Sequence, residues 1–524
     1  MTATDRRRWI TLLVLCLSLM VIGIDNTILN VALPTLVRDL HASSSELQWI
    51  VDAYILVFAG LLLTAGSLGD RFGRRGVLSV GLAIFGASSA AAAFASNTDQ
   101  LIAYRAVMGI GGALIMPATL SILINVFTDP KERGRAIGIW AGVAGIGIAV
   151  GPIVGGVLLQ HFWWGSVFLV NVPVAFGALI LGRIFVPTSK DPSAPRLDPI
   201  GAALSMAGLS ALLWAIIGAP TRGWSAPETI GGLLAAFAVL GAFAAWELHT
   251  DHPMLDVSFF RNPRFTVASL AITSGFFAIS GALFMTTQLL QSVMGYDALQ
   301  AGLRLAPIAV VLMIGGPLSP RLVERFGTKR MVTFGLGTAA CGLLLLASVS
   351  IGSPYPLVLG GLCTMALGMS MTMAPATESI MGSLPLEKAG VGSAVNGTTR
   401  QTGGALGVAV LGSILVSGYQ STLHVHLRGA DAATARASVG SAVQLGEHIG
   451  GRVGATVIEA ARAAYVHGMH LSFLVGAGIL VCGAVLAVKF LPAWAPRREL
   501  DATQYLPTDI VIDPAELVPA GVPE

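Results

Sequence analysis

Residues 9–33 read WITLLVLCLSLMVIGIDNTILNVAL, and this stretch decides the class of protein to which the chain belongs. A helix needs about 20 mainly apolar residues to cross the hydrocarbon core of a bilayer, and this run is 25 residues long. Its single charged residue is Asp25. Three arginines, residues 6–8, precede it as in a secretory signal peptide. The run is nevertheless longer than the apolar region of a signal peptide and has no small-residue cleavage site before Pro34, so we expect a retained transmembrane helix.

The whole chain shares this apolar character. Hydrophobic residues make up 54% of its 524 residues and charged residues 11%, whereas soluble proteins carry about 25% charged residues. We therefore expect an all-α, polytopic membrane protein without a soluble catalytic domain, and not an enzyme. The net charge of +3 comes from Lys and Arg spread between apolar runs, so nucleic acid is not an expected partner. The cysteines lack paired spacing, so we expect no disulfide framework, metal or cofactor; they are Cys16, Cys341, Cys363 and Cys482.

About fourteen apolar segments are long enough to span a membrane. They cover residues 10–33, 48–68, 77–95, 100–122, 136–158, 167–186, 200–219, 229–247, 265–290, 302–320, 331–350, 356–380, 391–417 and 468–490. The short connections between them alternate between many and few Lys or Arg residues, with Arg38 and Arg222 as exceptions in the poor set. The positive-inside rule places the rich set, and both termini, in the cytoplasm. We expect a multi-pass protein of the plasma membrane, the inner membrane of a bacterium.

Two short motifs recur at nearly the same offset. Residues 70–75, DRFGRR, are echoed by residues 324–330, ERFGTKR, and residues 130–133, PKER, are echoed by residues 385–388, PLEK. The first offset, from 70 to 324, is 254 residues, and the second, from 130 to 385, is 255 residues. Two homologous six-helix halves explain both echoes, and transporters built from parallel halves bind substrate between them near the membrane midplane.

These repeats predict the division of the chain. Residues 1–198 form the first six-helix half, and residues 199–250 form an inserted pair of transmembrane helices. Residues 251–495 form the second half, with a long external loop at 418–467 that is helix-prone and caps the outer vestibule in our interpretation. Residues 496–524 combine acids with prolines and are expected to be a disordered cytoplasmic tail.

Seven motifs, taken in order, resemble the fourteen-helix drug:proton antiporter family (EmrB/QacA type) of the major facilitator superfamily over nearly the whole chain. They are residues 25–34 (DNTILNVALP), 48–54 (QWIVDAY), 66–75 (GSLGDRFGRR), 105–112 (RAVMGIGG), 151–156 (GPIVGG), 168–173 (FLVNVP) and 396–404 (NGTTRQTGG). The resemblance implies the fold of that superfamily and proton-coupled drug export. The chain departs from the family at residues 164–166, WGS, where the family has Trp-Arg-Trp, and at residues 396–401, NGTTRQ, where Asn-Asp-Thr-Thr-Arg-Glu is common. Two acids beside Arg400 are therefore absent.

Asp25 is the first candidate functional residue. It lies about 15 residues into its helix, past the membrane centre toward the outside at about 1.5 Å per residue. Burial in lipid disfavours a bare charge, whereas an approaching cation stabilises it, so one carboxyl group can hold a proton or a cation but not both well. That competition is the minimum chemistry of antiport. The alternative is an acid that only hydrogen-bonds neighbouring helices.

Four other ionisable residues are candidates for proton coupling or substrate binding. Asp52, near the start of its helix, is either a second proton or cation site or an acid favoured by the helix dipole. Arg105, which the family resemblance implicates in proton movement, either tunes Asp25 or Asp52 electrostatically or reaches to the membrane surface. Arg400 is an intramembrane cation that needs an anionic partner or water. Glu378 is either a relay acid or an interfacial residue.

Two glycine-containing motifs point to conformational change. Small residues on one helix face let two backbones approach closely, and the resemblance makes this the antiporter motif packed between the halves; its residues are Gly151, Pro152, Gly155 and Gly156. The loop at residues 66–75 resembles the superfamily's conformational latch, in which the acid meets the positive end of a second-half helix that here begins near Gly390. Its residues are Gly66, Asp70, Arg71, Gly73 and Arg74.

We interpret the protein as a proton-coupled exporter of small lipophilic drugs or toxic compounds, with organic cations as the leading substrates. Met and aromatic residues are candidates for an adaptable cavity; they include Phe58, Met116, Trp140, Phe276, Phe284 and Met285, with Gln288 and Gln291 as polar contacts. The expected partners are the substrate, protons and membrane lipids, and the expected state is a monomer. A lipid or metabolite exporter of the same fold, and a membrane sensor or scaffold without transport, remain alternatives.

Overall fold

The computed structural model describes residues 3–189, 198–250, 253, 255–384, 389–424, 427 and 429–493, except for the side chains of some helical residues. The described residues form helices and no strands. The first seven helices are α1 (Ala3–Leu40), α2 (Ser44–Phe72), α3 (Arg74–Ala93), α4 (Thr98–Val126), α5 (Pro130–His161), α6 (Ser166–Leu169) and α7 (Asn171–Phe185). They are followed by α8 (Pro199–Arg222), α9 (Pro227–His249), η1 (Val257–Arg261), α10 (Pro263–Gln288), η2 (Leu289–Val293), α11 (Ala298–Phe326), α12 (Thr328–Ala347), α13 (Tyr355–Met381), α14 (Ala389–Thr422), α15 (Gly429–Ala437), α16 (Val439–Ile449) and α17 (Gly451–Phe490).

Several helices begin where the sequence supplies a capping side chain. Ser43 accepts a hydrogen bond from the backbone of Glu46, whose carboxylate accepts one from the Ser43 backbone, so a capping box starts α2. Asn97 caps α4 and Asp297 caps α11 in the same way, each with its side-chain oxygen. These caps satisfy backbone donors that would otherwise be left free at the membrane surface.

The first bundle consists of α1 to α7. α1 packs against α4, α5 and α7, while α4 also packs against α2 and α3. α6 and α7 together form one span that bends at Val170. α1 thus has neighbours on several sides, which explains why residues as deep as Val31, Ala32 and Leu33 are completely buried.

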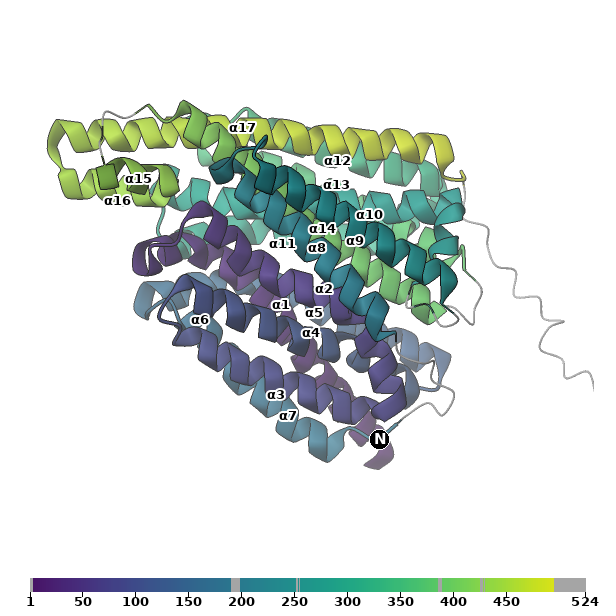
Figure 1. Ribbon diagram of the computed structural model, residues 1–524. Coiled ribbons are helices and arrows are strands. Elements are labelled where there is room, and N and C mark those ends of the chain that lie inside the picture. The colour runs from purple at the N-terminus through teal and green to yellow at the C-terminus, as the bar shows by residue number, and fades with distance from the viewer. Residues whose placement is uncertain are drawn as a thin grey trace, which may run out of the picture.

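The second bundle consists of α10 to α14 and α17. α10 packs along α14, α12 packs between α13 and α17, and α11 packs against α13. The two bundles meet along two seams, one between α5 and α11 and one between α2 and α14. The N-terminus and the C-terminal end of α17 lie at the same end of the molecule, at the right of Figure 1. We name this the terminal end and the opposite end the distal end.

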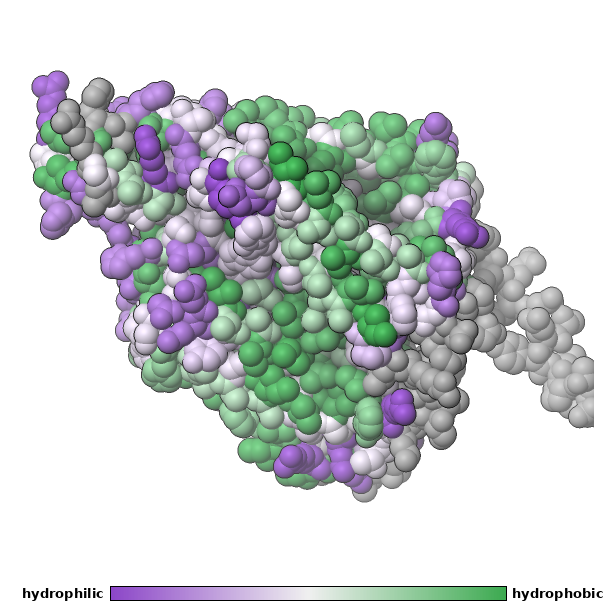
Figure 2. Space-filling model, viewed as in Figure 1, coloured by the Kyte–Doolittle hydropathy of each residue, from purple (hydrophilic) through white to green (hydrophobic). Residues whose placement is uncertain are grey.

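The inserted pair, α8 and α9, lies on the outside of the α2/α14 seam. α8 contacts both α2 and α14, and α9 packs against α8 (Figure 1). Much of α9 faces outward with apolar side chains, and Leu234 is 67% exposed and Phe237 64% exposed. An outward face of this composition is suited to lipid. Figure 2 shows hydrophobic residues over the middle of the molecule and hydrophilic residues gathered toward its two ends.

The predicted number of spans agrees with the structure. Thirteen helices among the described residues are long and apolar enough to cross a membrane. The apolar stretch Val150–His161 belongs to α5, which is 32 residues long and supplies the fourteenth span. The chain is thus an all-α, multi-pass membrane protein with two six-helix bundles and an inserted pair.

The region predicted as an external loop, residues 418–467, is largely helical. α14 continues to Thr422, and α17 already begins at Gly451, which makes α17 a helix of 40 residues, about 60 Å long. α15 and α16 lie beside this extension and project from the distal end (Figure 1). Tyr419 of α14 donates a hydrogen bond of 2.6 Å to the Ala435 carbonyl, which ties α15 to α14. The tail at residues 496–524 lies outside the described residues.

Contacts at the distal end join the two bundles. Gln291, in η2, donates a hydrogen bond of 2.8 Å to the Val31 carbonyl of α1. Ser44, at the start of α2, donates a hydrogen bond of 2.9 Å to the carbonyl of Ala437, the last residue of α15. Gln291 was predicted to contact substrate, but here its amide joins the halves. Direct hydrogen bonds therefore connect the two halves of the chain at the distal end.

Candidate functional site

Three helices of the first bundle bring Asp25, Arg105 and Asn171 together. Arg105 Nη1, from α4, donates to Asp25 Oδ2, from α1, at 2.5 Å. Asn171 Nδ2, from α7, donates to Asp25 Oδ1 at 3.2 Å and to Ser89 Oγ at 3.3 Å. The exposed fractions are 0% for Asp25 and 1% for Arg105 and Asn171. Both oxygens of the predicted acid thus have a donor in the interior.

Arg105 is held by more than the ion pair. Its Nε donates to the Ile50 carbonyl of α2 at 3.1 Å, and its Cζ lies 4.4 Å from the centroid of the Tyr54 ring. The guanidinium therefore links α1 to α2 as well as to its own helix. Two opposite charges buried in contact form a neutral unit, but removal of one partner leaves the other charge uncompensated, at a cost of about 3–5 kcal/mol.

Asn171, Tyr54 and Ser89 were not among the predicted site residues. Asn171 and Tyr54 lie within quoted motifs, yet neither carries a charge that would mark it as a partner of Asp25. The available signal for Asn171 is its place as the first residue of α7, just after the bend at Val170. A polar side chain at an interrupted point of an apolar span is a reasonable sign of an internal hydrogen bond.

Asp52 lies on the other face of α2, away from Arg105. It is completely buried, and neither carboxyl oxygen has a hydrogen-bond partner among the described residues. Its neighbours one helical turn away on the same face are Gln48 and Leu56. Leu56 packs with Leu213 of α8 and with alanines of α14. Arg105 therefore contacts Asp25 and not Asp52, and electrostatic tuning of an acid by Arg105 stays a prediction.

The surroundings of Asp52 form a seam between α2, α8 and α14. Ser413 of α14 donates to Gln48 Oε1 at 3.5 Å and to the Ile216 carbonyl of α8 at 2.9 Å. Pro220, four residues after Ile216, has no N–H for that carbonyl, which explains why a side chain from another helix supplies the donor. The inserted helix is thus hydrogen-bonded to the second bundle across the seam.

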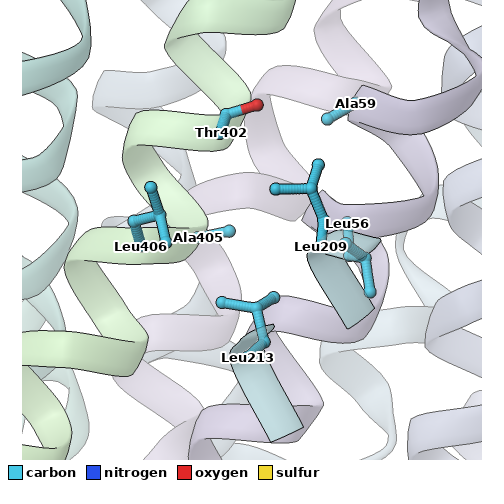
Figure 3. A pocket seen from close by; sticks show the side chains of 7 residues that line it. All are labelled: Leu56, Ala59, Leu209, Leu213, Thr402, Ala405 and Leu406. Atoms are coloured by element: carbon cyan, nitrogen blue, oxygen red, sulfur yellow. The ribbon is translucent and has the colours of Figure 1, made fainter. Parts of the chain in front are cut away.

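A small apolar cavity lies in the same seam, toward the terminal end from Asp52. Figure 3 shows side chains from α2, α8 and α14 converging on it. Its volume is about 10 Å³, room for little more than one water molecule, and it is lined by Leu56, Ala59, Leu209, Leu213, Thr402, Ala405 and Leu406. Its lining is almost entirely hydrocarbon, so a polar ligand has nothing to bind there except the Thr402 hydroxyl.

The two predicted charges of the second bundle lie apart from Asp25. Arg400, in α14, has its Cζ 5.6 Å from the centroid of the Phe276 ring in α10. Its Nε is buried without a hydrogen-bond partner among the described residues. Glu378 is exposed near the end of α13, close enough to Arg264 for an electrostatic interaction. The structure therefore joins Asp25 and Arg105 by a direct contact, whereas Asp52, Glu378 and Arg400 make no contact with another predicted charged site residue in the described part of the chain.

The sequence profile of the Major Facilitator Superfamily matches residues 15–408, about three quarters of the chain. The chain belongs to the Major Facilitator Superfamily. It is 37% identical over 496 residues to the multidrug efflux pump LfrA of Mycolicibacterium smegmatis, an alignment that covers 93% of this chain and 97% of LfrA. It is 32% identical to the tetracenomycin C resistance and export protein of Streptomyces glaucescens, with 92% and 91% of the two chains covered. The methyl viologen resistance protein SmvA of Salmonella typhimurium is 33% identical, with 94% and 100% covered.

Solved structures of the superfamily share the fold. An inward-facing, unoccupied bacterial homologue of the lysosomal transporter Spinster superposes with a TM-score of 0.64 at 19% identity, covering 94% of this chain and 99% of that chain. A D-xylose-proton symporter superposes with a TM-score of 0.61 at 16% identity, covering 93% and 98%. The superfamily fold predicted from the motifs is thus confirmed, and the named relatives agree with the resemblance to drug antiporters.

The antiporter motif of this superfamily member packs in two directions. A Cβ added to Gly151 would lie 3.0 Å from the Ile24 carbonyl, and one added to Gly155 would lie 3.2 Å from the Ile28 carbonyl, both in α1 of the same bundle. Gly156 instead faces Leu299 of α11, whose Cα would lie 2.6 Å from an added Cβ. The expectation that the motif packs between the halves is met by Gly156, whereas Gly151 and Gly155 bring α5 against the helix that carries Asp25.

Residues 66–75, which were predicted to be a loop, belong to α2 and α3 except for Gly73, which joins the two helices. This segment is attached to the chain just after α7. Gly73 has a φ of +105°, which favours glycine, and separates α2 from α3. The Arg74 backbone donates to the Ser189 carbonyl at 3.0 Å, and Arg75 Nη1 donates to the Val186 carbonyl at 3.4 Å. Gly66 lies within α2, and Arg71 is exposed. The side chain of Asp70 lies outside the described residues.

Proposed function

We propose that this protein is a proton-coupled antiporter that exports lipophilic, mainly cationic, drugs or toxic compounds by alternating access. Three relatives that each align over more than nine tenths of the chain support drug export, since their names refer to multidrug efflux, tetracenomycin C export and methyl viologen resistance. The observation that carries proton coupling is the buried contact of Asp25 with Arg105 and Asn171. Substrates are transported unchanged, without catalysis.

A proton on Asp25 changes the forces between three helices. The carboxylate accepts from Arg105 of α4 and Asn171 of α7, and protonation removes the negative charge that holds Arg105. Arg105 keeps its contacts with Ile50 and Tyr54 of α2, so the link that weakens is the one to α1. Because Gly151 and Gly155 leave α1 against α5 with little side-chain volume between them, α1 can shift along α5 when that link weakens.

Asp52 is proposed as a second proton or cation site. It lies where α2 of the first bundle meets α14 of the second, so its charge state acts directly on the seam between the halves. A buried carboxylate without a donor is costly, so we expect Asp52 to carry its proton in this conformation. Charged groups of the second half, Arg400 and Glu378, are proposed to act on the path of the substrate.

Alternating access requires that one end of the molecule face the cytoplasm and the other end face the outside. The terminal end, with the Arg-rich junction of α2 and α3, is proposed to be cytoplasmic by the positive-inside rule, and both termini with it. The motif at that junction, including Asp70, Arg71 and Arg74, is proposed as a latch at the start of α14. The two bundles are proposed as the moving halves, 1–198 and 251–495, of a monomer in the inner membrane surrounded by lipid.

Transport by purified protein in proteoliposomes tests this function. With a proton gradient of the correct sign, the wild type should move ethidium, and it should stop when the gradient is collapsed. Asp25→Asn should abolish gradient-driven transport, because it removes the exchangeable charge while it keeps the size of the side chain. Asp99→Asn, an exposed acid at the start of α4, is the matched control and should transport normally.

Efflux that survives Asp25→Asn would remove Asp25 from the mechanism. Indifference to cationic dyes together with co-purified lipid would favour the lipid or metabolite exporter. A protein that shows no substrate-dependent proton flux with any compound would favour the sensor or scaffold.

A further inference from the structure

Arg400 lies deep in the second bundle. It is the twelfth residue of α14 and the sixth of the apolar part of that helix, Val395–Thr422, which is long enough to span a membrane. The neighbouring helix α10 runs beside it, and added Cβ atoms at Gly403 and Gly407 of α14 would meet Thr273 and Phe277 of α10. This close packing fixes the relative position of the two helices at the level of Arg400.

The guanidinium of Arg400 lies against α10, with its Cζ 5.6 Å from the centroid of the Phe276 ring. Phe276 is three residues beyond Thr273, the residue of α10 that faces Gly403.

Among the described residues, no side chain neutralises the charge of Arg400. Within the described ranges, Arg400 has no salt bridge or hydrogen bond, and its Nε is buried without a partner. The adjacent Asn396 carries no charge: its Nδ2 donates to Thr377 of α13 at 3.4 Å, and its Oδ1 accepts no hydrogen bond from Arg400 or from any other described residue. Gly397 and Gln401, which stand where the resembling family often has acids, supply no negative charge. As a whole residue, Arg400 is nevertheless partly exposed.

We propose that Arg400 binds an oxyanion carried by the transported molecule, a carboxylate, sulfonate or phosphate on a lipophilic body. An intramembrane cation without a counter-charge is costly. A ligand that supplies the negative charge removes this cost, and the free energy recovered favours its binding. The planar guanidinium matches the two oxygens of such a group, and the Phe276 ring offers an apolar face for the body attached to it. The proposal rests on the exporter function and extends its substrates to zwitterions and amphiphilic anions.

Two dyes that differ in one group provide the test. Rhodamine 110 carries a free carboxylate, and rhodamine 123 is its methyl ester. We would measure the binding of each to purified protein in nanodiscs by fluorescence anisotropy, without a proton gradient. The wild type should bind rhodamine 110 more tightly, and Arg400→Gln should weaken rhodamine 110 about 10- to 100-fold, the range of a charge-assisted hydrogen bond, with less than a twofold change for rhodamine 123.

Two variants complete the design. Arg400→Lys keeps the charge without the planar fork and should retain part of the preference for rhodamine 110. Arg304→Gln is the matched control, because Arg304 also lies over an aromatic ring, 3.8 Å from that of Tyr296, but at the start of α11. It should leave both dyes unchanged.

Three outcomes would overturn the proposal: equal wild-type affinity for the two dyes, equal loss of both in Arg400→Gln, or an unchanged preference in that variant. The first comparison needs no substitution, so it stands even where a variant fails to fold. Since binding is read without a gradient, loss of ethidium transport would contradict the antiporter function and leave the assignment of Arg400 intact.

Discussion

Asp25 and Asp52 lie in consecutive helices of one bundle and are both completely buried, yet they differ in whether their carboxyl oxygens have hydrogen-bond donors. Asp25 accepts hydrogen bonds from Arg105 and Asn171. Asp52 has no hydrogen-bond partner among the described residues and is near a seam lined by leucine, isoleucine and alanine. α2 separates the two sites, since Ile50 and Tyr54 on one face contact Arg105 and Asp52 points from the other face.

Since Asp25 and Asp52 are equally buried, burial alone does not assign a role to an intramembrane acid. Asp25 has its charge balanced inside one bundle, so protonation there changes how helices of that bundle hold together. Asp52 faces the other bundle and the inserted helix, so protonation there changes how the halves meet. In the proposed mechanism, a proton on Asp25 therefore acts on α1, and a proton on Asp52 acts on the seam between the halves.

The largest expected effect breaks the pair at Asp25. Arg105→Ala leaves the Asp25 carboxylate buried with Asn171 as its remaining donor, so the free energy of unfolding should fall by about 3–5 kcal/mol. The measurement is chemical denaturation of purified protein in mixed micelles. The double variant Asp25→Asn with Arg105→Gln removes both charges and should recover more than half of the loss. An Arg105→Ala protein as stable as the wild type would mean that the pair is not buried as described.

Much of this organisation could be predicted from the sequence, because hydropathy and charge act locally. The apolar runs predicted the spans, and the recurrence of residues 70–75 at 324–330 predicted two bundles. The motif at residue 105 predicted a functional arginine, but not which of two acids it contacts. Which acid Arg105 contacts depends on the rotation of α2 about its axis, which places Tyr54 toward α4 and Asp52 toward α8. Residues two apart on a helix lie on nearly opposite faces, so a small error in the expected rotation exchanges the two.

Other features could not be predicted because they depend on contacts between distant segments. Asn171 has no charge to mark it, and its partnership with Asp25 requires α7 to lie beside α1. The hydrogen bond from Ser413 to the Ile216 carbonyl requires the inserted helix to lie on the α2/α14 seam. The sequence contains Pro220, which frees that carbonyl, but not the identity of the donor.

An intermediate effect is expected where α1 slides past α5. Gly151→Ala places a methyl group against Thr27 and Ile24 of α1, so α1 must shift, at a cost of about 1–3 kcal/mol. We expect slower ethidium efflux than wild type at equal protein amount, measured in proteoliposomes. Gly177→Ala is the control, since no heavy atom lies within 4 Å of a Cβ at that position, and it should keep full efflux. Wild-type efflux rates in both variants would mean that transport does not require α1 to move along α5.

The smallest stability effect is expected at Asp52, and it sharpens the contrast with Asp25. Replacement of a buried polar group that has no partner by an apolar one of similar size is nearly neutral or stabilising, because no donor is left unsatisfied. Asp52→Leu should therefore change the free energy of unfolding by less than about 1 kcal/mol, whereas Asp25→Leu should lose about 3–5 kcal/mol because it leaves Arg105 without its counter-charge. The same denaturation in mixed micelles measures both. Proton flux per ethidium should nevertheless fall in Asp52→Leu, since the seam then has no group to titrate. Equal destabilisation by the two leucine substitutions would show that Asp52 has a partner in the folded protein, and an unchanged proton flux would leave Asp25 as the coupling acid.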